Sequence, residues 1–220
     1  MSGAASGIGL ATVAALRAWG AEVLGTDCSP SPADASLIQA DLTNPTQVDA
    51  LFDAVQTHLG APDILVSCAG LGLHEQLATG DPAKWARVLD VNALGALRFV
   101  RAFVPGMLQQ GGDIVIISSV AAQQAYPWGG PYAASKAALD MAAETLRLEV
   151  LPSIRVTTIA PGAVDTPLLA HMLSGNQSAD EAGLEVLQAE QVAELIVYAV
   201  SRPANMAISH LTVRPRAQAF

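Results

Sequence analysis

Short apolar runs alternate along the chain with longer stretches in which apolar residues recur at helical spacing. Strands are predicted at 20–26, 36–40, 62–68, 113–117, 154–159 and 207–213, and helices at 8–19, 43–58, 82–109, 131–150 and 190–201. The strands are apolar at consecutive positions, which is typical of a parallel sheet that helices cover on both faces. The pattern therefore predicts one α/β domain over residues 1–220, built on a doubly wound parallel sheet.

The segment 167–188 follows neither the helical nor the strand period clearly. It contains Leu168, Leu169, Met172 and Leu173 but no charged side chain that can be assigned as a substrate anchor. We expect this segment to form a lid over an apolar substrate pocket. Trp128 and His74 fit either the mouth of such a pocket or an ordinary surface or core position.

Composition narrows the range of partners. The net charge is −9, which argues against nucleic acid or an anionic membrane as a partner. No run approaches the roughly 18 apolar residues of a membrane span, and no basic segment precedes the first apolar residues as in a signal peptide. The only cysteines, Cys28 and Cys68, do not form a disulfide framework, so a cytoplasmic protein is expected. The four histidines are scattered without ligand spacing, and no metal site is predicted.

A glycine-rich stretch at Gly3, Gly7 and Gly9 leads directly into the first predicted helix. Glycines permit a tight turn and let backbone N–H groups approach a diphosphate at a helix N-terminus, although such a start also fits a flexible tail. The next predicted strand ends at Asp27, near the spacing of about 20 residues at which a dinucleotide fold binds the adenosine ribose. A carboxylate in a turn after a strand is the alternative interpretation of Asp27.

Tyr132 and Lys136 are four residues apart in the predicted helix 131–150 and so share one of its faces. A neighbouring ammonium favours the phenolate and is expected to lower the pKa of Tyr132, which would make it a general acid/base near neutral pH. Such a pair also occurs on ordinary solvated helix faces. Its context favours chemistry, because Asp27, Gly70, Ser119 and Gly162 each follow a predicted strand, at the edge where parallel sheets bind ligands.

In this order and spacing the residues resemble the short-chain dehydrogenase/reductase family over essentially the whole chain. Gly3, Gly7 and Gly9 look like its cofactor loop, and Cys68-Ala69-Gly70 is similar to its Asn-Ala-Gly motif with Cys in place of Asn. Asn92 matches the family's helix Asn, and Ser119 matches its catalytic Ser. Tyr132 and Lys136 match its Tyr–Lys pair, and Pro161-Gly162 with Thr166 is similar to the motif that holds the nicotinamide carboxamide.

The resemblance implies a Rossmann-like fold and a catalytic set of Asn92, Ser119, Tyr132 and Lys136. Tyr132 would exchange a proton with the alcohol, Ser119 would hydrogen-bond the reacting oxygen, and Lys136 would hold the nicotinamide ribose and depress the Tyr132 pKa. Asn92 would order a water that connects Lys136 to solvent, and Asp41 would meet the adenine amine. Cofactor contacts are expected from Gly3, Ser6, Gly7, Ile8, Gly9, Asp27, Asp41, Leu42, Cys68, Ala69, Gly70, Tyr132, Lys136, Pro161, Gly162, Val164 and Thr166.

One departure concerns the sheet. The family places a strand directly before its glycine-rich loop, and the printed chain starts at Met1 with none. Burial of such a strand of about six residues contributes on the order of 5–10 kcal/mol, comparable to the stability of a whole domain. We therefore expect the sequence to be truncated at its start, with a rearranged sheet or a strand supplied by a dimer partner as alternatives.

The expected activity is NAD-dependent interconversion of a secondary alcohol and a ketone, with NAD preferred because Asp27 would repel a 2′-phosphate. The alternative is a catalytically silent or truncated NAD-binding protein with a regulatory role. Helix 131–150 carries an apolar stripe (Ala133, Ala137, Ala138, Ala142, Leu146 and Val150) that fits either the core or a subunit interface. Because the family often pairs such helices, a homodimer or homotetramer is expected.

Overall fold

The computed structural model describes residues 1–30, 37–172 and 185–218. Its strands are β1 (Thr26–Asp27), β2 (Ile38–Gln39), β3 (Ile64–Ser67), β4 (Gly112–Ile117), β5 (Ile154–Pro161) and β6 (His210–Val213). Its α-helices are α1 (Gly7–Ala18), α2 (Pro45–His58), α3 (Pro82–Leu89), α4 (Ala96–Gln110), α5 (Gly130–Glu149), α6 (Pro167–Met172) and α7 (Ala189–Val200). A π-helical stretch (Asp90–Gly95) joins α3 to α4, and a short 3-10 turn (Val120–Ala122) follows β4.

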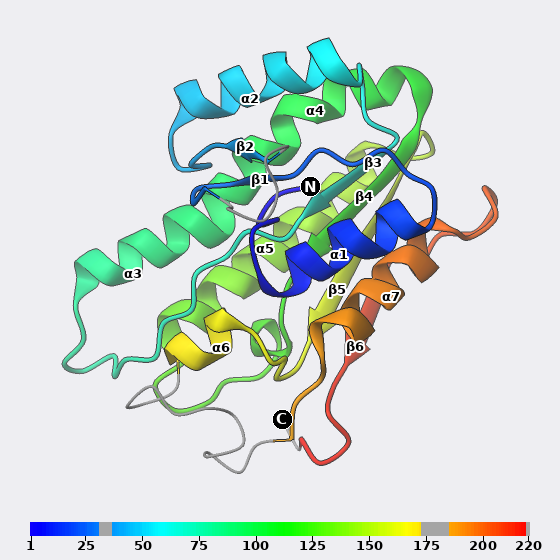
Figure 1. The fold of residues 1–220 in the computed structure, drawn as a ribbon. Coiled ribbons are helices and arrows are strands. Elements are labelled where there is room, and N and C mark those ends of the chain that lie inside the picture. Colours follow the sequence, from blue (N-terminus) through cyan, green and yellow to red (C-terminus); the bar gives the residue numbers. More distant parts are fainter. Residues whose placement is uncertain (31–36, 173–184, 219–220) are drawn as a thin grey trace.

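Helices cover both faces of a parallel sheet, as predicted (Figure 1). Successive side chains of β3 and β4 point to opposite faces. Leu65, Ile114 and Ile116 pack under α2, α4 and α5, whereas Val66, Val115 and Ile117 pack under α1 and α7. This double burial explains why β3 and β4 are apolar at consecutive positions, Ile64–Val66 and Ile114–Ile117.

The sheet is interrupted between β1 and β3. The strand order is β3-β4-β5-β6 in one four-stranded piece and β1-β2 in a separate pair. Met1 and Ser2 join the two pieces: the Ser2 N–H donates to the Val66 carbonyl (2.9 Å), and the Thr26 N–H donates to the Met1 carbonyl (2.8 Å). Behind Met1, a cavity of about 410 Å³ separates the segment 20–25 from β3. The predicted strand 20–26 is therefore wrong over most of its length, because residues 20–25 lack a strand alongside with which to pair.

The long helix predicted at 82–109 is one continuous helical segment of three pieces, with Asn92 in the π-helical turn. By length and composition alone this segment, Pro82–Gln110, could cross a membrane. Its residues Phe99, Phe103 and Met107 are fully buried in the core against the sheet, which is the environment of a core helix.

The stripe predicted along α5 belongs only partly to the core: Val150 is buried and Leu146 packs against the core, whereas Ala137 and Ala138 are exposed. The buried residues within α5 are Pro131, Tyr132, Ser135, Lys136, Leu139 and Ala143. The predicted stripe contained only apolar residues. The structure also buries the polar Ser135 and Lys136, because this part of α5 packs at the carboxyl edge of the sheet. At the start of α2 the Asn44 side chain caps the helix, accepting hydrogen bonds from the N–H groups of Thr46 and Gln47.

Candidate functional site

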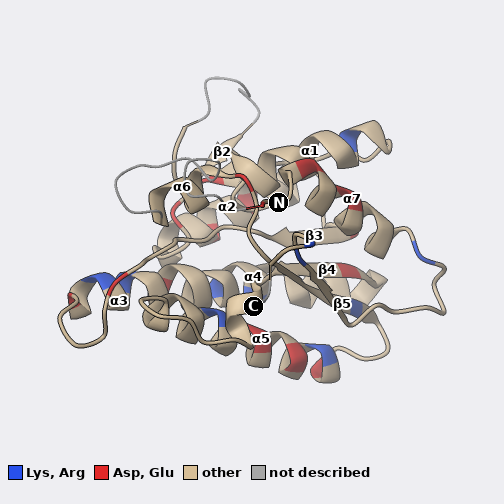
Figure 2. Ribbon diagram, turned by 90° about the horizontal axis from the view of Figure 1, so that it is seen from below, with Lys and Arg blue, Asp and Glu red and all other residues tan. Residues whose placement is uncertain are grey.

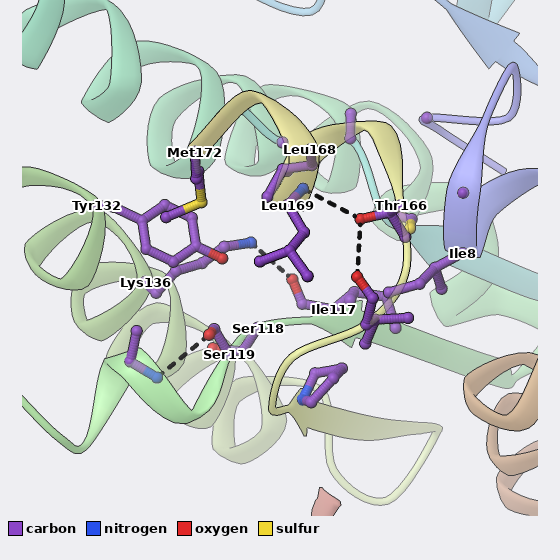
Figure 3. Close-up of a pocket in the computed structure, with 18 of the residues that line it drawn as sticks. Ile8, Ile117, Ser118, Ser119, Tyr132, Lys136, Thr166, Leu168, Leu169 and Met172 are labelled. Carbon is purple, nitrogen blue, oxygen red and sulfur yellow. Dashed lines mark hydrogen bonds between the residues drawn. The ribbon is translucent and has the colours of Figure 1, made fainter. Parts of the chain in front are cut away.

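A cavity of about 990 Å³ lies across the carboxyl ends of the strands and continues under α6 (Figure 3). Every residue predicted to contact cofactor or substrate lines it, with the exception of Asn92. These residues come from the start of the chain and from the segments that follow β1, β2, β3, β4 and β5. The topology thus gathers side chains that are far apart in the sequence, as expected for ligand sites in open α/β sheets.

The glycine-rich loop turns tightly beneath the start of α1. Gly3 has a φ of +67°, and a side chain there would lie 2.8 Å from the backbone nitrogen of Ala69. A Cβ at Gly9 would overlap the carbonyl oxygen of Gly3. The Ser6 side chain does not cap the helix, so the N-terminal end of α1, where the helix dipole favours an anion, is left open to the cavity.

Ser2 fastens this loop to β3. Its hydroxyl accepts hydrogen bonds from the N–H groups of Cys68 (3.1 Å) and Ala69 (3.3 Å), and its side chain is fully buried. This role was missed from the sequence, because the partners lie more than sixty positions away. Burial raises the pKa of the Cys68 thiol to about 12, so Cys68 is a neutral part of the wall at physiological pH.

Two carboxylates stand at the end of the cavity near β1 and β2. Asp27 accepts hydrogen bonds from the N–H groups of Ala5 (3.1 Å) and Ser29 (3.0 Å), one to each oxygen. Hydrogen bonds from the backbone and side chain of Thr43, and then the nearby Arg87, lower the pKa of Asp41. Arg87, whose guanidinium lies 3.4 Å from Asp41, lines the cavity but was not predicted, since nothing in the sequence links α3 to β2.

Ser119, Tyr132 and Lys136 converge in the middle of the cavity (Figure 3). The Lys136 ammonium donates to the Ile117 carbonyl (3.0 Å) and lies 5.9 Å from the centre of the Tyr132 ring. Burial lowers the pKa of Lys136 to about 8, and the negative charge of Asp140, one turn along α5, opposes this shift.

The expected depression of the Tyr132 pKa is wrong for the protein without cofactor. Burial raises the pKa of Tyr132, and a hydrogen bond with Ser119 only partly opposes this. The physical reason is desolvation: burial of the phenol removes the water that would stabilise its charged form.

Asn92 lies behind the cavity wall, fully buried. Its side-chain oxygen accepts a hydrogen bond from the Leu71 N–H (2.7 Å), and its amide donates to the Leu71 carbonyl and to the Ser135 hydroxyl (2.9 Å each). Asn92 is thus more than a tolerated helix residue: it holds the turn after β3 against α5, next to Lys136. The π-helical turn is the local distortion that carries this side chain.

The loop after β5 forms the opposite wall. Pro161, Gly162, Val164 and Thr166 line the cavity, and the Thr166 hydroxyl donates to the Val164 carbonyl (3.2 Å). Leu168, Leu169 and Met172 of α6 line the cavity. They belong to the segment 167–188 that is predicted to form a lid, of which residues 173–184 lie outside the described part of the chain. His74 lines the cavity, whereas Trp128 does not; the two rings pack against each other in a tilted arrangement, with 5.5 Å between their centres.

The chain's own atoms fit a dinucleotide better than a compact ligand. The cavity runs continuously from Asp41 past the glycine loop to Tyr132, and a Cβ at Gly3 or Gly9 would clash with the backbone that shapes this loop. Among the described residues, no three His, Cys, Asp or Glu side chains are grouped so that they could hold a metal ion. Lys and Arg residues are dispersed over separate elements of the described chain (Figure 2).

Comparison with known proteins agrees with this geometry. The family model for the short chain dehydrogenases matches residues 1–177. The chain belongs to the short-chain dehydrogenase family. It is 36% identical to an uncharacterized oxidoreductase of Mycobacterium tuberculosis, with all of this chain and 91% of that protein aligned.

Two further relatives carry specific names. The chain is 34% identical to a glycine betaine reductase of Emericella nidulans over 98% of its own length, but it spans only 18% of that protein. A serine dehydrogenase solved in a closed form with NADP⁺ superposes with a TM-score of 0.92 at 26% identity, covering all of this chain and 95% of that one. This protein is therefore an oxidoreductase of the short-chain dehydrogenase family with its Rossmann-like fold.

Proposed function

We propose that the protein interconverts a secondary alcohol and a ketone with NAD as the hydride carrier. The observation that carries the proposal is the convergence of Ser119, Tyr132 and Lys136 on one cavity whose other end is a glycine-lined cradle. An acid/base, an oxygen-binding hydroxyl and an ammonium in one site match the needs of proton-coupled hydride transfer.

The bound nicotinamide would supply only the hydride chemistry; the chain's own side chains would move the proton. In reduction, the Tyr132 phenol gives its proton to the carbonyl oxygen, and in oxidation it takes the proton of the hydroxyl. The Ser119 hydroxyl donates a hydrogen bond to that oxygen as negative charge develops on it. Lys136 holds the ribose, and Asn92 keeps the turn after β3 in place and orders a water that connects Lys136 to solvent.

Asp27 supports the choice of NAD over NADP. Its carboxylate lines the cavity at the end of β1, and its two oxygens keep lone pairs for ribose hydroxyls beyond the bonds from Ala5 and Ser29. A 2′-phosphate at the same place would meet like charge. The nearby cation, Arg87, is already paired with Asp41. Because the related serine dehydrogenase was solved with NADP⁺, this preference needs a direct measurement.

An apolar small alcohol or ketone suits the substrate end of the cavity. Leu168, Leu169 and Met172 cover this end, and among the described lining residues near Tyr132 the charged groups are Lys136, which is assigned to the ribose, and Glu185. A homodimer or homotetramer remains our expectation. It is supported by large apolar side chains exposed on α5 and beside the π-helical turn, among them Met141 (69% exposed), Leu148 (59%) and Leu94 (52%).

Turnover separates this function from a silent nucleotide-binding role. We would titrate NADH and NADPH by fluorescence and then measure NADH formation with a panel of secondary alcohols, using Tyr132→Phe as the matched variant. Loss of general acid/base catalysis is expected to lower kcat about 10²–10⁴-fold while NADH still binds. Binding without turnover by the unmodified chain across the panel would favour the silent role. Tighter binding of NADPH than NADH would refute the cofactor choice.

A further inference from the structure

The end of the described chain folds back onto the cavity. Residues 215–218 form a tight turn in which the Gln218 N–H donates to the Pro215 carbonyl (3.1 Å). Pro215 is buried, and Gln218 is half-buried and lines the cavity beside the loop that follows β5. The turn is also tied to the segment before α7, because the Ala217 N–H donates to the Glu185 carboxylate (3.0 Å).

The side chain of Gln218 binds the backbone of that loop. Its Oε1 accepts a hydrogen bond from the Ala163 N–H (2.9 Å), and the Ala163 carbonyl accepts one from the Leu187 N–H (2.9 Å). Both polar backbone groups of Ala163 are therefore already paired, the N–H with Gln218 and the carbonyl with Leu187. The fit is close, because a Cβ at Gly162 would overlap Gln218 Oε1.

The pairing of Ala163 determines the direction of the backbone N–H and carbonyl groups of the next residue, Val164. Val164 forms an isolated parallel bridge with Leu187, in which the hydrogen bonds are made by Ala163 and Asp165 rather than by Val164 itself. In extended chain, successive N–H and C=O groups alternate in direction, so those of Val164 face the opposite way from Ala163, toward the cavity that Val164 lines. The Thr166 hydroxyl donates to the Val164 carbonyl, which leaves the Val164 N–H as the group presented to a ligand.

We propose that Gln218 is a positioning residue, which locks Ala163 so that the Val164 N–H is aimed at the primary carboxamide of the nicotinamide. The inference rests on the proposed dinucleotide function and adds to it a residue at the far end of the chain. Without the Gln218 acceptor, the partly buried Ala163 N–H would lose its partner in the protein, and the loop would turn to find another. The effect should then be confined to ligands that carry the nicotinamide.

The test compares NADH with ADP-ribose, which has the same nucleotide but lacks the nicotinamide ring. Affinities would be measured by calorimetry for the unmodified chain, Gln218→Met and Gln218→Glu. Met keeps the length of the side chain and removes the acceptor, whereas Glu keeps an acceptor oxygen. We expect Gln218→Met to raise the Kd for NADH about tenfold, which is about 1.4 kcal/mol, and to leave the Kd for ADP-ribose within about twofold. Gln218→Glu should keep the NADH affinity within about threefold.

Gln110→Met is the control. The Gln110 side chain also bonds a backbone group, donating to the Ala61 carbonyl (3.0 Å), but it does not line the cavity. The proposal is overturned if Gln218→Met weakens NADH no more than Gln110→Met does, if it weakens ADP-ribose as much as NADH, or if Gln218→Glu fails as badly as Gln218→Met. Failure of the proposed function would look different, because the unmodified chain would then bind neither NADH nor ADP-ribose.

Discussion

In a 220-residue chain that starts at Met1, as printed, the α-amine of Met1 is expected to make the stability of the fold depend on pH. This amine is buried, donates to the Leu24 carbonyl (3.1 Å) and stands at the end of the cavity between β1 and β3. Burial lowers its pKa from 8.0 to about 5, with a weak opposing effect from Cys68. An amine whose folded pKa is below its unfolded value must take up a proton on unfolding, so acid favours the unfolded chain.

The size of the effect follows from the shift. A difference of about 3 pKa units corresponds to about 4 kcal/mol. The contribution of the neutral amine to stability is fully present above pH 8, is lost as the pH falls from 8 to 5, and changes no further below pH 5. This is a large part of the 5–15 kcal/mol that typically stabilises a domain.

Acetylation of the α-amine isolates this contribution, because an amide does not titrate. The cavity of about 410 Å³ beside Met1 offers room for the acetyl group. We would unfold both forms with urea at intervals from pH 5.5 to pH 8, following circular dichroism, after intact mass has verified that Met1 and its modification are present. All other titrating groups are common to the two forms and cancel in the difference.

We expect the acetylated form to gain stability over the free form as the pH falls, with the gap widening by about 3–4 kcal/mol across this range. A gap that does not change with pH would report only the packing of the acetyl group. That result would refute the conclusion that the amine is buried and neutral in the folded protein.

Three further outcomes are expected. Gly9→Ala should abolish measurable NADH binding, because the added Cβ would overlap the Gly3 carbonyl. The control Gly106→Ala, in α4, should bind NADH normally, because its Cβ would lie 3.3 Å from the nearest atom. Equal NADH affinities of the two variants would contradict the steric argument. Arg155→Met should lower the free energy of unfolding by about 3 kcal/mol, and the Tm by about 6–12 °C, because it breaks a bidentate and mostly buried ion pair with Asp113. Arg147→Met, at the more exposed ion pair with Glu144, should cost under about 1 kcal/mol. Similar losses of Tm in the two variants would contradict the difference expected between a buried and an exposed pair. Met141→Glu should shift gel filtration toward the monomer without changing the urea midpoint, and a monomer volume for the unmodified chain would show that this face is not an interface.

The sequence alone was sufficient to predict those features that depend on local chemistry and on the periodicity of apolar residues. Continuous apolar strands and alternating helices predict a parallel sheet with two covered faces, and the structure has one. The carboxyl ends of parallel strands meet at one edge, so residues after each strand, such as Asp27 and Ser119, could be assigned to one site from their sequence positions. The role of the glycines could also be predicted, because a tight turn in which two backbone segments are in contact leaves no room for a Cβ.

Only the tertiary structure decided the properties that depend on burial and on distant partners. The pKa of Tyr132 is raised rather than lowered because burial disfavours the charged phenolate, and spacing along a helix cannot reveal burial. Residues 20–25 have the pattern of a strand but lack a paired neighbour, so the slot behind Met1 stays open. Gln218 reaches Ala163 across more than fifty positions of sequence. The pattern of apolar and polar residues predicts which side of a helix or strand is apolar. Strand pairing, desolvation and long-range contacts depend on which other parts of the chain pack against that segment.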